Sequence, residues 1–136
     1  MKAIKELKIV FGELIGTVVF LTILYGSVAQ VVFGVNNFYT ICVAHFVGLA
    51  AGIYISRNLS GAHLNPAVTL ALCTFRNPRD FKRLPLYFIG QFAGAFLAAA
   101  IVYGLYSGNY FFVSSSKLIT QMLINFKSQQ TKVYRL

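Results

Sequence analysis

The sequence predicts an all-α membrane protein with three transmembrane helices and one shorter, re-entrant half-helix. Hydrophobic residues make up 57% of the 136-residue chain, and charged residues make up only 11%. A soluble globule of this length cannot bury so much apolar surface, so the bilayer is the expected solvent. Three apolar runs reach about 20 residues each, the length that an α-helix needs to cross the hydrocarbon core.

The apolar runs place the helices in chain order. Residues 1–8 are short and basic, and spanning helices are expected at about 9–33, 38–56 and 84–106. A further helix at about 66–75 is apolar but would reach only about 15 Å, half the thickness of the core. It is therefore expected to enter and leave the membrane on one side.

The basic residues orient these helices. Eight of the 12 Lys and Arg residues precede the first helix or lie between the second and third: Lys2, Lys5, Lys8, Arg57, Arg76, Arg79, Lys82 and Arg83. By the positive-inside rule, residues 1–8 and 57–83 are predicted to be cytoplasmic, in an integral protein of the plasma membrane. Because the charges lie at the edges of apolar runs and not along one face, membrane lipid is the expected partner and nucleic acid is not.

Residues 109–136 differ in character from the helices before them. Their one apolar run, 118–126, is too short to cross a bilayer, and the remainder is polar. We expect an exposed or interfacial tail that is ordered only when something packs against it. The change after about Gly108 is interpreted as the end of a truncated or alternatively terminated product.

The polar stretch "SGAHLN" at residues 60–65 interrupts the apolar sequence just before the half-helix. Asn65 is a favoured N-cap residue, and Pro66 suits the first turn of a helix. Non-helical backbone at membrane depth is tolerated only where protein covers it or where it lines a wet cavity. A half-helix whose positive end is directed at the membrane midplane is a device for handling a permeant polar molecule.

Two further patterns concern packing. "GELIG", "GLAAG", "GQFAG" and "GLYSG" place small residues four apart, which predicts close contact between helix backbones. Aromatic residues near the helix ends, Tyr87 among them, are interpreted as anchors at the membrane interface.

The stretch "SGAHLNPAVT" at residues 60–69 resembles the first signature of the major intrinsic protein family, the aquaporins and glycerol facilitators. "GELIGT" at 12–17 is similar to the start of the family's first helix. "GSVAQVV" at 26–32 and "GQFAGAFLAAAIVYGLY" at 90–106 resemble the aquaglyceroporin branch. The resemblance covers nearly all of residues 9–106 and leaves 109–136 outside the family pattern.

The resemblance implies one inverted repeat of the aquaporin fold. Family members have two such three-helix repeats, each with a half-helix whose asparagine meets its twin at the pore centre, and four pores per assembly. Pro66, Pro78 and Pro85 are the only prolines here, so a second signature with its filter arginine is not in this chain. The chain is therefore interpreted as the first half of the fold, with one NPA repeat.

The resemblance also implies roles for the loop residues. The side-chain amide of Asn65 would donate to a passing water or alcohol oxygen, besides capping the helix, which contributes about 1 kcal/mol. The carbonyls of Gly61, Ala62 and His63 would form a ladder of acceptors, because carbonyls replace hydration without adding charge. Leu64 completes the predicted pore-lining loop, which Pro66 supports.

His45 is a further predicted pore residue. Counted back from Asn65, it occupies the position at which glycerol facilitators place an aromatic ring of their selectivity filter. A neutral imidazole both donates and accepts hydrogen bonds, so it would make the constriction more polar. The alternatives are a buried histidine bonded to a neighbouring helix, and Phe46 at this position if the register shifts.

Glu13 is an acidic residue inside an apolar run, which makes it a candidate for function. We expect it to accept hydrogen bonds from loop 57–65 and to hold the shape of that loop, as the resemblance implies. Gln91 is interpreted as a similar internal support. The alternative for Glu13 is a proton relay, for which only His45 and His63 could serve as further titratable groups.

Together these features predict a channel for passive transport of water, glycerol and small neutral solutes, in a homo- or hetero-oligomer such as the family tetramer. The alternative is a non-conducting truncated subunit that associates with full-length aquaporins or regulates them. An enzyme is not expected, because three acidic residues and two histidines supply no catalytic set. Cys42 and Cys73 lack paired spacing, so neither a metal, a cofactor nor a disulfide is predicted.

Overall fold

The computed structural model describes residues 2–34, 36–76 and 78–133, and all regular structure in them is helical. The elements are α1 (Lys2–Val32), α2 (Phe38–Ser56), α3 (Pro66–Phe75), the 3₁₀ helix η1 (Pro78–Arg83) and α4 (Leu84–Val133). Three segments of the described chain are long and apolar enough to cross a membrane: Ala3–Val32, Phe38–Ser56 and Phe81–Gly108. The ten residues of α3 are apolar but shorter. The predicted fold class, three spanning helices with one half-helix, is confirmed.

Two helix boundaries differ from the expected ones. α1 begins at Lys2 and not near residue 9, because the segment "KAIKELK" consists mainly of good helix formers. α4 does not end near residue 106 but continues to Val133. No proline follows Pro85, and Gly108 by itself does not stop a helix. Apolar runs mark where a helix is inside the membrane, and the helix itself extends beyond them at both places.

The chain divides into two compact units at Gly104. The first contains α1, α2, α3, η1 and the beginning of α4, and the second is the remainder of α4 with the residues after it. Residues 109–133, expected as a tail without fixed order, are described as helix. Residues 134–136 of that expected tail lie outside the described residues. Its place outside the family pattern stays a prediction.

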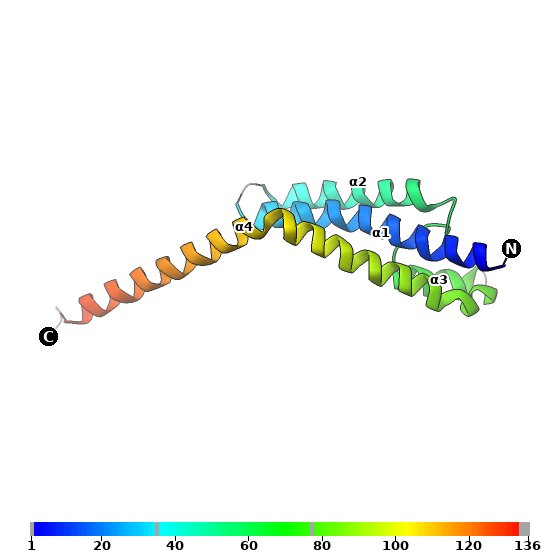
Figure 1. Cartoon of the computed structure of the whole chain (residues 1–136). Helices are drawn as coiled ribbons and strands as arrows, with labels where there is room; N and C mark the ends of the chain where they lie inside the picture. The colour runs from blue at the N-terminus through cyan, green and yellow to red at the C-terminus, as the bar shows by residue number, and fades with distance from the viewer. Residues whose placement is uncertain (1, 35, 77, 134–136) are drawn as a thin grey trace. The chain divides into compact units, whose positions relative to one another are not determined.

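Glycines bring the helices of the first unit into backbone contact. α1 and α2 form a hairpin in which a Cβ atom on Gly52 would lie 2.7 Å from the carbonyl oxygen of Gly16. α4 runs alongside α1 in the same direction, and Cβ atoms on Gly90 and Gly94 would lie 2.6 and 2.7 Å from carbonyl oxygens of α1. Figure 1 shows these helices side by side, with α3 at the end of the bundle where the N-terminus lies. The predicted packing role is wrong only for "GLYSG", since Gly104 has no neighbour within 4 Å.

This packing makes a testable distinction between two glycines of α4. Gly90→Ala is expected to destabilise the bundle by about 1–3 kcal/mol, because the new methyl group collides with the backbone of Val10. Gly104→Ala is the matched control: it meets open space and improves helix propensity, so it should be neutral or stabilising by up to about 1 kcal/mol. Thermal unfolding of the purified chain in detergent compares the two. Equal melting temperatures would contradict close packing at Gly90.

Candidate functional site at the loop before α3

The loop that leads into α3 has an unusual backbone. Residues 61–64 belong to no helix, and three of them have positive φ angles: Gly61 at 93°, Ala62 at 57° and Leu64 at 55°. Glycine adopts such angles freely, but for an L-residue the left-handed region costs about 1–2 kcal/mol. Ala62 and Leu64 keep this conformation only if their surroundings hold it.

Glu13 of α1 supplies the main support from outside the loop. Its side chain is fully buried, and its Oε1 atom accepts the backbone N–H of His63 at 3.0 Å. Its Oε2 atom accepts the backbone N–H of Leu64 at 2.7 Å and the Nε2 group of Gln91 at 2.8 Å. Hydrogen bonds to a charged acceptor are about twice as strong as neutral ones. Glu13 thus bonds two consecutive amides at the strained part of the loop.

A second set of bonds joins the loop to α3 and α4 through Thr69. The Nε2 group of Gln91 donates to Thr69 Oγ1 at 2.9 Å, and Thr69 Oγ1 lies 3.0 Å from the carbonyl oxygen of Asn65 and 3.2 Å from His63 Nδ1. A hydroxyl has one proton to donate. If that proton goes to the Asn65 carbonyl, His63 must carry its own proton on Nδ1, and its tautomer is thereby set.

The start of the loop is held by Ser60 and Tyr87. Ser60 Oγ accepts the backbone N–H of Ala62 at 3.1 Å, and the Tyr87 hydroxyl donates to the Ser60 carbonyl at 3.1 Å. The rings of Tyr87 and His63 stack at 4.3 Å with an angle of 9° between their planes. Tyr87 is only 5% exposed. The interpretation of Tyr87 as an interfacial anchor is therefore wrong: it is an internal contact of the loop.

Asn65 and Pro66 form the junction between loop and half-helix. Asn65 has an extended backbone, and its Oδ1 atom accepts the N–H of Ala67 at 2.8 Å. Pro66 occupies the first turn, where its missing N–H leaves no bond unmade. Because the amide oxygen is committed to the cap, the NH₂ group is the remaining polar group of this exposed side chain.

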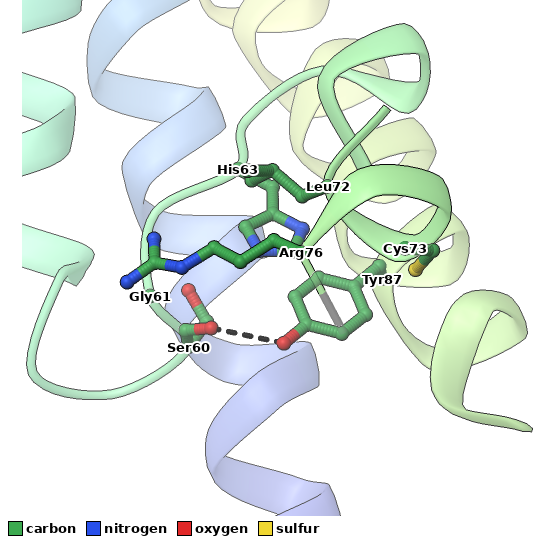
Figure 2. A pocket seen from close by; sticks show the side chains of 7 residues that line it. All are labelled: Ser60, Gly61, His63, Leu72, Cys73, Arg76 and Tyr87. Atoms are coloured by element: carbon green, nitrogen blue, oxygen red, sulfur yellow. Dashed lines mark hydrogen bonds between the residues drawn. The ribbon is translucent and has the colours of Figure 1, made fainter. Parts of the chain in front are cut away.

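Two cavities flank the loop. One of about 300 Å³ is lined by Gly61, His63, Tyr87 and four others, and Figure 2 shows Arg76 beside it at the end of α3. The other, of about 170 Å³, lies at Asn65 and Pro66 between α1 and α4. Its lining includes Thr17 and Gln91, whose Oγ1 and Oε1 atoms are buried and have no hydrogen-bond partner within the described residues. Buried oxygens of this kind are normally satisfied, so this cavity suits a polar group.

His45 lies apart from these contacts. It is exposed on α2, and its ring packs edge-on against Phe20 at 5.2 Å. Its exposure contradicts the alternative of a buried histidine bonded to a neighbouring helix. Phe46, the other candidate for the filter position, is 75% exposed. The structure brings neither side chain into the bonded network of the loop.

Sequence reasoning missed three polar residues of this site: Thr69, Ser60 and Thr17. Thr69 and Ser60 lie within the quoted motif, but local sequence does not distinguish a hydroxyl that bonds other helices from one that bonds its own. Thr17 lies one helical turn after Glu13, on the same face. That spacing from an intramembrane carboxylate is the signal that could have identified it.

A bundle of spanning helices around a half-helix, with a strained polar loop at its head, has the architecture of a membrane transport protein. The family model described as Major intrinsic protein matches residues 1–134. The chain belongs to this family.

Individual relatives support the same assignment. The chain is 46% identical over 100 residues to "Aquaglyceroporin" of Plasmodium berghei, 38% identical over 111 residues to "Aquaporin-9" of Homo sapiens, and 42% identical over 98 residues to "Glycerol uptake facilitator protein" of Pseudomonas aeruginosa. These matches cover 71%, 79% and 71% of this chain, but only 38%, 37% and 35% of the relatives. The chain therefore spans well under half the length of these curated relatives. The matched families are channels and not enzymes.

A solved structure agrees with the fold. The aquaglyceroporin from Plasmodium falciparum superposes with a TM-score of 0.71 at 36% sequence identity. The match covers 82% of this chain and 45% of that one. The fold of the described chain is thus the fold of part of an aquaglyceroporin.

Proposed function

We propose that this chain forms one side of a pore for passive transport of water, glycerol and small neutral solutes. One observation carries the proposal. Within the described residues, the carbonyl oxygens of Gly61 and Ala62 accept no hydrogen bond, and the NH₂ group of Asn65 donates none. Two acceptors and one donor thus remain available along five consecutive residues, where backbone is tolerated only beside protein or water.

The chemistry of these groups favours neutral solutes. A water or polyol hydroxyl can donate to a carbonyl of the loop, and its oxygen can then accept from Asn65. None of the groups is charged, and the positive end of α3 repels cations. We assign the pore lining to Gly61, Ala62, His63, Leu64 and Asn65, with His45 further along α2. Leu64 contributes through its backbone, since its side chain is buried against Gly16.

Glu13, Gln91 and Pro66 are proposed to support this lining without contacting the solute. Each is committed to the loop or to the first turn of α3 through the contacts described above. The oxygen of the solute meets a donor that cannot pass on a proton, because Asn65 is an amide. The names of the relatives, aquaglyceroporins and a glycerol uptake facilitator, support the same substrates.

A second function, a non-conducting subunit that associates with full-length relatives, is favoured by a separate observation. The cavity at Asn65 and Pro66 exposes two unpartnered oxygens, and the aromatic side chains of Phe92 and Phe96 nearby on α4 are 64% and 75% exposed. A further protein segment would satisfy the oxygens and cover the aromatic rings. This segment could come from a homo- or hetero-oligomer in the plasma membrane, with the basic N-terminal end in the cytoplasm.

Asn65→Asp tests the conducting function without removing the cap. Aspartate keeps an oxygen for the N–H of Ala67 but replaces the NH₂ donor by a carboxylate. Water and glycerol permeability of reconstituted vesicles is expected to fall about tenfold, the loss of one hydrogen bond of roughly 1.4 kcal/mol. Asn58→Asp makes the same charge change at an exposed position outside the loop and should leave permeability unchanged.

The two functions give different results in the same assay. If the chain alone raises permeability above that of empty vesicles, and Asn65→Asp removes the increase, it conducts. If it conducts nothing alone but changes the permeability of a co-reconstituted full-length family member, the second function holds. A chain that conducts equally well with Asn65→Asp would overturn the assignment of Asn65.

A further inference from the structure

A third cavity lies at the basic end of the bundle, on the side of the loop away from Asn65. Its volume is about 230 Å³, and three cationic side chains line it: Lys5 and Lys8 of α1, and Arg83 at the end of η1. Lys5 and Lys8 are three residues apart and therefore lie on one face of the helix. Segments far apart in the sequence thus bring positive charge to one place.

The charge of this cavity is not balanced by its own walls. Its remaining described lining residues are Ile9, Leu59, Ser60 and Tyr87, none of which is acidic. Glu13, the acidic residue nearest in the loop region, is already bonded to two backbone amides and to Gln91. Like charges that share a cavity repel one another, and a bound anion removes this repulsion.

The position of the cavity narrows the class of anion. Lys5 and Lys8 lie in the first turns of the span Ala3–Val32, and Arg83 lies in the first turn of the span Phe81–Gly108. Both spans begin at the same end of the bundle (Figure 1). This is the depth of phospholipid headgroups, and basic pockets between transmembrane helices are suited to anionic ones. Ile9 and Leu59 add an apolar wall against which the start of an acyl chain can lie.

We propose that this cavity binds a phosphate group, held by Lys5, Lys8 and Arg83. The phosphate belongs either to an anionic phospholipid of the surrounding leaflet or to a soluble phosphate compound. Serine and tyrosine hydroxyls add neutral donors at the inner wall of the cavity. No part of this inference depends on whether the chain conducts.

The site also borders the pore loop. Ser60 and Tyr87 line both this cavity and the 300 Å³ cavity that contains His63. The Tyr87 hydroxyl is bonded to the Ser60 carbonyl, and its ring is stacked on His63 (Figure 2). A phosphate bound behind Tyr87 is therefore one side chain away from the loop.

The test compares two double variants with the same change of charge. Lys5→Gln with Lys8→Gln removes two cations of the cavity, whereas Arg57→Gln with Lys82→Gln removes two exposed cations outside it. Each protein is reconstituted in phosphatidylcholine nanodiscs and titrated with phosphatidylglycerol, with binding followed by native mass spectrometry. The first variant is expected to bind about tenfold more weakly than wild type, and the second within about twofold.

Inorganic phosphate separates the two sources of the ligand. If phosphatidylglycerol binds and inorganic phosphate does not displace it, the ligand is the lipid; if inorganic phosphate binds and displaces it, the ligand is a soluble phosphate. In either case the cavity variant must lose binding selectively. Equal losses in both double variants would show diffuse surface charge and would overturn the proposal, as would undiminished binding in the first. Circular dichroism of each variant establishes that the helices are intact.

Discussion

Glu13→Ala is expected to destabilise the bundle by roughly 3–5 kcal/mol. The substitution leaves the backbone N–H groups of His63 and Leu64, and one bond of Gln91, without their buried acceptor. It also removes what holds Leu64 in the left-handed region, at a φ of 55°. The loop should then relax toward ordinary backbone angles, and α3 should lose its fixed position against α1 and α4.

Glu6→Ala is the matched control for this prediction. Glu6 lies two turns earlier on the same helix, and no hydrogen bond of its side chain is among those of the loop. Thermal unfolding in detergent should show a melting temperature for Glu13→Ala lower than that of Glu6→Ala by about 10 °C or more. Hydrogen exchange at the amides of His63 and Leu64 should rise in the first variant alone. Unchanged exchange at these two amides would refute the role of Glu13 in the loop.

The bonds of Glu13 also bear on the proton-relay alternative. Its carboxylate meets two backbone amides and a glutamine, none of which titrates. The His63 ring is directed to Thr69 and Tyr87, and His45 packs on Phe20. A relay needs a chain of titratable groups in contact with one another. The contacts of Glu13 instead favour a supporting role.

The fold was largely predictable because it depends on a length that the bilayer imposes. Apolar runs of about 20 residues placed α2 at its observed bounds, and the short run gave α3 with its Asn65 cap. The same reasoning failed at the start of α1 and the end of α4. There the helix leaves the membrane, and hydropathy reports the membrane and not the helix.

The site was predictable only where a residue was unusual for its surroundings. Glu13 is a carboxylate in an apolar run, and Asn65 and Pro66 form a capping pair, so each could be identified locally. Thr69 and Tyr87 could not, because threonine and tyrosine are ordinary in membrane helices. Their partners lie 22 and 27 residues away in the sequence. The positive φ of Ala62 was also beyond prediction, because alanine has no preference for that region and the surrounding bonds impose it.

Thr69→Val is expected to have the second largest effect, although valine has nearly the same shape as threonine. Thr69 is fully buried, and its hydroxyl is the common partner of Gln91, His63 and the Asn65 carbonyl. Valine leaves at least two of these polar groups buried without a partner, at about 1–3 kcal/mol each. A total loss of roughly 2–5 kcal/mol is expected, with little change in the packing volume.

Thr74→Val on the same half-helix makes the comparison specific. The Thr74 hydroxyl donates to the carbonyl of Leu70 within its own helix and is exposed, so water replaces the bond when it is lost. The two variants share the change in helix propensity and differ only in burial and partners. Thermal unfolding should therefore separate them by several kcal/mol, and the His63 ring should lose its fixed tautomer in Thr69→Val, as seen in ¹⁵N shifts of the imidazole. If both variants unfold alike, the hydroxyl of Thr69 does not connect the loop to α4, and Glu13 alone holds it.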